Sequence, residues 1–255
     1  MDKNVNDATS SIKGNIYQFI VALNDCFELN EGDNLLIEVH GDVSIAGLMQ
    51  KEIKHHDSKD NLTERDIDFW KTLANWYVSY DSIKNYNSLI LFTTSEIPID
   101  SRLQKWNDKS ANEKLSILTA IGSEHKKREE TFRKEFLRIF NDAYNEKRLL
   151  DILNKFKIEQ ENDNINTISK SIYTRILYIP DKNRDNFIAA LLGLIILKIT
   201  KPPYKWEISY SDFKKFLQEE TPKYANESSI PLSTEFAYQE PRDEQKKELL
   251  DKVFV

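Results

Sequence analysis

Residues 37–56 of the chain, IEVHGDVSIAGLMQKEIKHH, contain the features that decide its fold. The run LLIEVHGDVSI at 35–45 is rich in β-branched residues and predicts a strand, with Gly41 as a bend or bulge. Residues 49–56 predict a second strand, which pairs back on the first through a turn at Ala46 and Gly47. The stretch is therefore expected to form a β-hairpin.

Helical and extended segments alternate around this hairpin. Residues 8–29 repeat apolar side chains at three- and four-residue spacing and predict an amphipathic helix. After the hairpin, Thr63 is expected to cap a second helix, which carries Trp70 and Tyr77 on its buried face. Residues 88–94, SLILFTT, form a short apolar run that is typical of a central strand. The order helix, hairpin, helix, strand predicts an α/β (α+β) fold, with a mixed sheet flanked by helices.

The rest of the chain is expected to be mainly helical. A helical pattern of apolar side chains runs through 113–153, and further helices are expected at 168–178, 184–200 and 212–219. A short strand is expected at 156–158.

The composition changes near residue 150. A polar, linker-like stretch, EQENDNIN, follows at 159–166. We therefore expect an N-terminal domain at 1–150 and a small, mainly helical module at 151–255, whose last residues from 228 form a polar tail.

The composition also excludes several classes of protein. The chain has 255 residues, a net charge of −6 and one cysteine, Cys26, which cannot form an internal disulfide. It has 6 glycines and lacks the GxGxxG, GxxxxGK[ST], GxSxG, HExxH and paired CxxC patterns of common enzyme classes. The longest apolar run, 188–197, is too short to cross a bilayer, and the polar N-terminus has no signal core. We expect a cytoplasmic protein that does not contact a membrane.

The hairpin carries a pattern of acidic and basic side chains. Asp42 is followed, after nine intervening residues, by Glu52-x-Lys54. Residues two apart in a strand share a face, so Glu52 and Lys54 project together while Ile53 points into the core. Asp42 and Glu52 offer the oxygen ligands that Mg²⁺ prefers, and Lys54 can hold an attacking water and offset charge in a pentacoordinate state. The pattern predicts a phosphodiester hydrolysis site. Taken alone, it also fits a surface ion pair, because Glu-x-Lys recurs at Glu124 and Glu244.

Residues around the hairpin extend this pattern toward a known family. They are GNIYQ at 14–18, the segment from Glu38 to Asp42, ExKH at 52–55, DFWKTL at 68–73, NW at 75–76, and the run at 89–94 that ends in two threonines. Their order resembles the N-terminal double-stranded DNA endonuclease domain of CBASS effectors, Lamassu systems and related NTPase-linked bacterial defence proteins, in the PD-(D/E)xK superfamily. The resemblance covers about residues 10–150. It implies a restriction-endonuclease-like mixed sheet flanked by helices.

The resemblance implies a role for each matching residue. Asp42, Glu52, Lys54 and Gln18 are the expected catalytic residues, with Gln18 and its neighbour Tyr17 supporting the site from the first helix. The expected ligands of Mg²⁺ are Glu38, Asp42 and Glu52, and Mn²⁺ is expected to substitute for Mg²⁺. Relatives often carry Gln at the position of Glu52, where Glu is the more usual residue of the superfamily, so metal binding should be stronger here.

Three residues are expected to contact DNA. They are Lys51, His55 and Lys59, which lie in or just after the second strand of the hairpin. His55 and His56 are adjacent in that strand, so they should face opposite ways and not share a metal ion.

The resemblance implies a metal-dependent double-stranded DNA endonuclease, an effector subunit of a bacterial anti-phage system, most like a Lamassu-type nuclease subunit. The region after 150 is too short for the cyclic-nucleotide sensor domain of CBASS effectors. Sensing is therefore expected from a separate SMC-like or other ATPase subunit, with restraint or activation by partners or by homo-oligomerisation. The alternative is a non-cleaving assembly or DNA-binding subunit that contacts such an ATPase, which the net negative charge and the apolar C-terminal helices favour.

Overall fold

The computed structural model describes residues 9–56, 60–124, 130–160 and 165–225. Its centre is a six-stranded mixed sheet in the order β5-β4-β3-β2-β1-β6. The strands β1, β2 and β3 are antiparallel neighbours, β6 pairs antiparallel with β1, and β3, β4 and β5 run parallel. Their bounds are β1 Asn34–Ile37, β2 Val43–Ile45, β3 Met49–Lys54, β4 Ser88–Thr93, β5 Phe156–Glu159 and β6 Glu207–Ser209. The expected mixed α/β fold is confirmed.

The hairpin contains one more turn than the sequence predicted. Residues 35–45 do not form one bent strand but two strands, β1 and β2, which pair antiparallel with Ile37 opposite Val43. Gly41 lies in the turn between them with φ +122°, and Glu38 begins it with φ +57°. Because Gly41 adopts a conformation that residues with a Cβ rarely reach, it lets the chain reverse instead of bulging. The second turn, at Ala46 and Gly47, joins β2 to β3 as expected.

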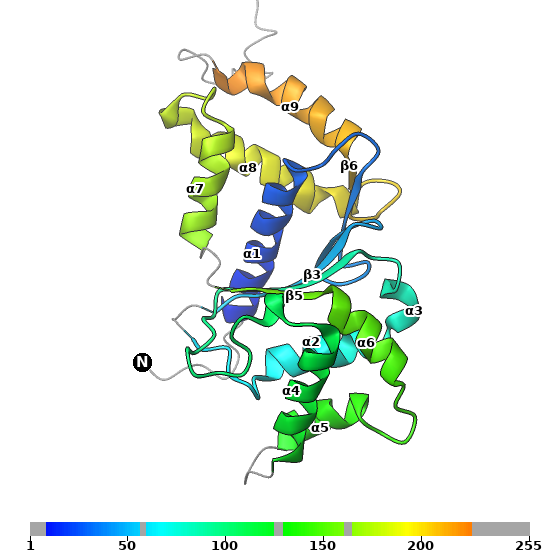
Figure 1. Ribbon diagram of the computed structural model, residues 1–255. Helices are drawn as coiled ribbons and strands as arrows, with labels where there is room; N and C mark the ends of the chain where they lie inside the picture. The colour runs from blue at the N-terminus through cyan, green and yellow to red at the C-terminus, as the bar shows by residue number, and fades with distance from the viewer. Residues whose placement is uncertain (1–8, 57–59, 125–129, 161–164, 226–255) are drawn as a thin grey trace, which may run out of the picture.

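Helices cover both faces of the sheet (Figure 1). One face is covered by α1 Thr9–Cys26, α7 Ile165–Arg175, α8 Asp181–Leu197 and α9 Tyr210–Ala225. The other face is covered by α2 Ile67–Val78, α3 Tyr80–Ile83, α4 Ala111–Ser123, α5 Glu130–Ile139 and α6 Glu146–Lys155. Two short 3₁₀ helices, η1 Trp106–Asp108 and η2 Lys198–Thr200, complete the described elements. Each face has its own apolar core, because alternate side chains of a strand point to opposite faces.

The start of α2 lies later than the sequence predicted. Asp66, not Thr63, is the N-cap, because its side chain accepts hydrogen bonds from the N–H groups of Asp68 (2.8 Å) and Phe69 (3.4 Å). The Thr63 carbonyl instead accepts the N–H of Asp66 at 3.1 Å, in a turn just before the helix. A carboxylate is a good acceptor for the free N–H groups of a first helical turn, so Asp66 caps α2 in place of the Thr63 hydroxyl.

The expected helical region 113–153 is divided into α4, α5 and α6. Ser110 and Glu113 form a reciprocal capping box at the start of α4. Asn145 caps α6 by accepting the N–H of Arg148 at 3.1 Å. Each cap gives a new helix its own beginning, so the charged and apolar pattern continues while the helix axis changes.

The boundary expected near residue 150 falls inside α6. Strands from both sides of it share one sheet, since β5 and β6 form the two edges. Side chains of α7 and α8, such as Ile172 and Phe187, pack in the same apolar cluster as Leu23 of α1 and Leu35 of β1. The described parts of 1–150 and 151–255 therefore share a core, and the assembly role expected for 151–255 stays a prediction. The polar tail from residue 228 lies outside the described residues.

At Ile158 the outer edge of β5 is covered by the side chain of Asn107. Asn107 of η1 accepts the N–H of Ile158 through Oδ1 at 2.8 Å and donates its Nδ2 to the Ile158 carbonyl at 2.9 Å. The amide thus occupies both ladder positions that a further strand would use.

None of the helices in the described ranges combines the length and apolar character needed to span a bilayer.

Candidate active site

The hairpin brings Asp42, Glu52 and Lys54 together. Lys54 Nζ lies 3.5 Å from Glu52 Oε2 and 3.8 Å from Asp42 Oδ2. Glu52 and Lys54 project from the same face of β3, as the two-residue period requires, and Asp42 ends the β1–β2 turn directly before β2. The side chains are 23% (Asp42), 13% (Glu52) and 22% (Lys54) exposed, so the group is largely shielded but reachable from solvent.

The backbone fixes the Asp42 carboxylate. Its Oδ2 accepts the N–H of Ile53 at 2.6 Å. Its own carbonyl accepts the N–H of Glu38 across the turn at 3.1 Å. The Asp42 side chain is therefore held by β3, while its backbone closes the β1–β2 turn.

Helix α1 contributes the expected support. Gln18 is buried and its Nε2 donates to the Asp42 carbonyl at 2.8 Å and to Glu38 Oε1 at 3.0 Å. Tyr17 is completely buried, and its ring lies 4.7 Å from the ring of His55, centroid to centroid. Gln18 thus holds the turn that carries Asp42, and its assignment as a catalytic residue stays a prediction.

Burial and mutual repulsion shape the charges of the site. Burial raises the pKa of Asp42, against the lowering effect of Lys54 and the Ile53 N–H, and Glu38 raises it further. Burial and the Asp42 carboxylate raise the pKa of Glu52. Burial alone would lower the pKa of Lys54, but the carboxylates of Asp42, Glu52 and Asp68 outweigh it and raise that pKa. Two carboxylates with raised pKa values beside one cation are an arrangement that a second positive charge would stabilise.

The donor set fits a hard divalent cation only in part. Asp42 and Glu52 supply two carboxylates, which is the number that Mg²⁺ commonly takes from a protein, with waters and substrate phosphate completing its shell. The expected third ligand, Glu38, is instead bonded to Gln18. Within the described residues no three His, Cys, Asp or Glu side chains form a group able to hold a metal ion. The role of Glu38 as a third ligand stays a prediction, and Asp42 and Glu52 are the two carboxylates that the structure brings together.

The predicted DNA-contacting residues are not brought together. Lys51 is buried on the opposite face of β3, where its Nζ pairs with Asp25 Oδ1 at 2.7 Å and Oδ2 at 2.8 Å, so its assignment to DNA is wrong. The strand period explains this, since Lys51 has the opposite parity to Glu52 and Lys54. His55 lies beside Tyr17 on the α1 side. Lys59 lies outside the described residues.

The adjacent histidines do face different partners, as expected. His56 Nε2 lies 3.2 Å from Asp68 Oδ2 of α2, on the other face of the sheet from Tyr17. The two rings, which directly follow β3, therefore lie on opposite faces of the sheet.

One residue of the site was missed by the sequence analysis. Gln50 Nε2 donates to Glu52 Oε1 at 3.0 Å. The signal was present, because Gln50, Glu52 and Lys54 are spaced by two and share one face of β3.

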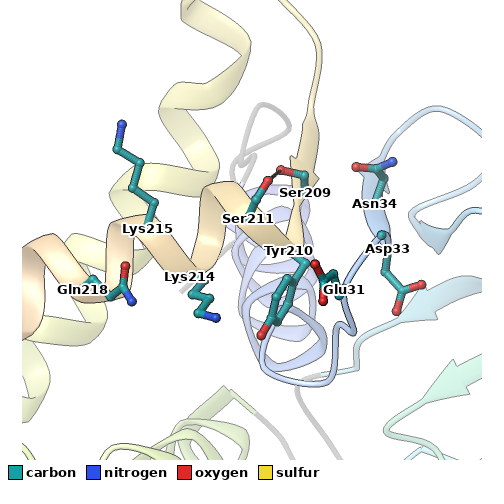
Figure 2. A pocket seen from close by; sticks show the side chains of 10 residues that line it. Glu31, Asp33, Asn34, Ser209, Tyr210, Ser211, Lys214, Lys215 and Gln218 are labelled. Carbon is teal, nitrogen blue, oxygen red and sulfur yellow. Dashed lines mark hydrogen bonds between the residues drawn. The ribbon is translucent and has the colours of Figure 1, made fainter.

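Two hollows flank the β1–β2 region. The smaller one, about 200 Å³, is lined by Glu52, by Val39, His40 and Gly41 of the β1–β2 turn, and by residues of α2 and α3. The larger one, about 570 Å³, lies between the start of β1 and the β6–α9 junction (Figure 2). It is lined by acidic Glu31 and Asp33 and basic Lys214 and Lys215, and by none of the predicted site residues. The hollow beside Glu52 is therefore the one relevant to the carboxylates.

Compared with known proteins, the chain matches no protein-family model and no curated protein.

Proposed function

We propose that this chain is a metal-dependent endonuclease that hydrolyses phosphodiester bonds of double-stranded DNA. The observation that carries the proposal is the grouping of Asp42, Glu52 and Lys54, with Lys54 Nζ within 4 Å of both carboxylates. The resemblance in motif order and the mixed sheet with helices on both faces support it. A surface ion pair alone would not call for two largely shielded carboxylates whose pKa values are both raised.

The residues have distinct tasks in this proposal. Asp42 and Glu52 would hold a divalent cation, which when bound polarises the phosphoryl oxygen and lowers the pKa of a bound water. Lys54 has a raised pKa and is protonated at neutral pH, so it acts as a donor and not as a base. It orients the attacking water and offsets the negative charge that develops on the phosphoryl group. Gln18 and the Ile53 N–H keep Asp42 in place.

The proposed function does not require the isolated chain to cleave DNA. The net charge of −6 gives DNA no general attraction to the chain, because non-specific DNA binding depends on neutralising many phosphates. We propose that a partner, such as an SMC-like or other ATPase subunit, or homo-oligomerisation, supplies the remaining DNA contacts. In this proposal the chain is an effector of a bacterial anti-phage system.

The test is cleavage of a supercoiled plasmid in Mg²⁺ or Mn²⁺ over a range of protein concentrations, with and without the proteins encoded beside it. Wild type is compared with Lys54→Ala and with the control Lys157→Ala, an exposed lysine of the edge strand β5, which is separated from β3 by β4. We expect wild type and the control to nick or linearise the plasmid, and Lys54→Ala to lose at least about a hundredfold in rate.

Two outcomes would contradict the proposal. Full cleavage by Lys54→Ala would assign the activity elsewhere. DNA binding that survives a chelator, with no cleavage under any metal or partner, would favour the non-cleaving assembly subunit.

A further inference from the structure

Gln50 is a buried polar residue beneath the candidate site. Its side chain is completely buried in β3. Its Nε2 donates to Glu52 Oε1 at 3.0 Å and, more weakly, to the Lys51 carbonyl at 3.3 Å. Its Oε1 has no hydrogen-bond partner. Burial of an unpaired carbonyl oxygen costs free energy, so the amide is not explained by stability.

The β1–β2 turn is shaped around this amide. A Cβ added to Gly41 would lie 1.7 Å from Gln50 Nε2 and 2.8 Å from Glu52 Oε1. The turn therefore lies directly against the contact between the amide and the carboxylate. Gly41 serves two needs at once, since its φ of +122° also disfavours any other residue.

The two oxygens of Glu52 have separate neighbours. Gln50 holds Oε1, and Lys54 Nζ lies 3.5 Å from Oε2. A carboxylate held at one oxygen cannot rotate freely about its last bond, so its other oxygen keeps a constant direction. Partners of this kind, one step behind a metal ligand, commonly set ligand orientation and metal affinity.

We propose that Gln50 is a positioning residue that fixes the orientation of the Glu52 carboxylate for a divalent cation. The inference rests on the proposed function. Gly41 and Gln50 act together in it, because the missing Cβ of Gly41 leaves the space that the Gln50 amide occupies. Gln50 touches no substrate in this proposal and acts only through Glu52.

The neighbouring strand offers a matched control. Ser44 of β2 lies directly opposite Gln50 in the sheet, and it is also buried with a hydroxyl that has no partner. Ser44→Ala therefore removes a buried polar group from the same layer without touching Glu52. Gln50→Met keeps an unbranched side chain of similar length and removes the donor, and Gln50→Leu is a second apolar replacement.

The experiment measures three quantities on wild type, Gln50→Met, Gln50→Leu and Ser44→Ala. They are the thermal midpoint, the affinity for Mn²⁺ by calorimetry without DNA, and kcat and KM for plasmid cleavage. We expect the Gln50 variants to keep or raise the thermal midpoint, to bind Mn²⁺ about tenfold or more weakly, and to lose kcat with little change in KM. Ser44→Ala should match wild type in Mn²⁺ affinity and kcat.

The outcomes separate this inference from the proposed function. Unchanged Mn²⁺ affinity and kcat in Gln50→Met would overturn the positioning role and leave the nuclease proposal standing. A lower thermal midpoint with a matching loss of binding would mean that Gln50 is only structural. If wild type binds Mn²⁺ but does not cleave, weaker binding in the Gln50 variants would still support the positioning role. Absence of Mn²⁺ binding by wild type would overturn both.

Discussion

At the scale of single residues, β3 presents two opposite environments on its two faces. Glu52 and Lys54 face the candidate site, and Lys51, directly before Glu52, enters the apolar core beneath α1. There Lys51 pairs with Asp25 and lies 5.2 Å from the centre of the Phe92 ring. Burial raises the pKa of Asp25, and Lys51 opposes this effect. Lys51 thus stabilises the ionised form of the buried Asp25 carboxylate.

Removing one partner of that pair should cost more stability than removing both. Lys51→Met leaves Asp25 as an uncompensated buried acid, and we expect it to lower the free energy of unfolding by about 3–5 kcal/mol. Lys51→Met combined with Asp25→Leu should recover most of that loss, because both charges then disappear. Urea unfolding of the two single variants and the double variant measures this. A double variant no more stable than Lys51→Met would contradict the role assigned to the pair.

The same residues show how far a sequence pattern can predict a site. The spacing of Asp42, Glu52 and Lys54 was sufficient, because a two-residue period and a tight turn fix which side chains meet. The burial of Lys51 follows from the same period, since Lys51 shares the core-facing side of β3 with Ile53. The contact of Glu38 with Gln18 depends on the exact path of the β1–β2 turn, which local sequence does not determine.

Among the helices and strands, α4 is linked to the α6–β5 segment by a buried lysine. Lys114 is buried, and its Nζ donates to the carbonyls of Leu153 (3.0 Å) and Phe156 (2.8 Å). It also lies 5.3 Å from the centre of the Trp106 ring. Burial, followed by the nearby charges of Lys157 and Lys109, lowers the pKa of Lys114 to about 8.

This lowered pKa should make stability depend on pH. In the unfolded chain the pKa of Lys114 returns to its ordinary value of 10.5, so between about 8 and 10.5 the unfolded state binds more protons than the native state. The free energy of unfolding should therefore rise with pH in that window, by at most about 1.4 kcal/mol per pH unit. Below about pH 8 the cost of the buried charge is fully present.

Comparison with Lys114→Met isolates this effect from other groups that titrate in the same range. Urea unfolding of both proteins should show a stability difference that shifts in favour of wild type as pH rises from about 8 to 10. A difference that stays constant with pH would mean that Lys114 titrates at its ordinary pKa in the fold.

Prediction of elements succeeded where periodicity was strong and failed at their ends. The runs that became α1, β4 and α8 were recognisable because their apolar spacing is regular. The start of α2 was placed three residues early, since Thr63 and Asp66 are both good caps and the choice depends on the preceding turn. The division of 113–153 into three helices depends on where the chain must turn back over the sheet.

In the complete fold, residues after 150 complete the sheet and the core. The strand β6 pairs with β1, and α7 and α8 cover α1. A chain ending at residue 160 would lose these elements and expose apolar side chains of α1 and β1, such as Leu23 and Leu35. No local sequence feature predicts that residues after 150 complete the core, because this depends on pairing between segments that are far apart in the chain.

We therefore expect a protein cut after residue 160 to lose cooperative unfolding, even though it keeps Asp42, Glu52 and Lys54. Circular dichroism and a thermal melt of the truncated and full-length proteins measure this. A truncated protein with a sharp, full-amplitude transition would contradict a shared core and would restore a separate domain at 1–150.

The amide of Asn107 has a consequence for how copies of this chain can meet. An open edge strand presents unpaired N–H and C=O groups, with which a strand of another chain can pair. Proteins protect such edges against this pairing. Here the N–H and the carbonyl of Ile158, which a further strand would pair with, are both hydrogen-bonded to the Asn107 side chain. Two copies of this chain could join their sheets at β5 only by first displacing Asn107. We therefore expect any oligomer to form through side-chain contacts or at the β6 edge of the sheet.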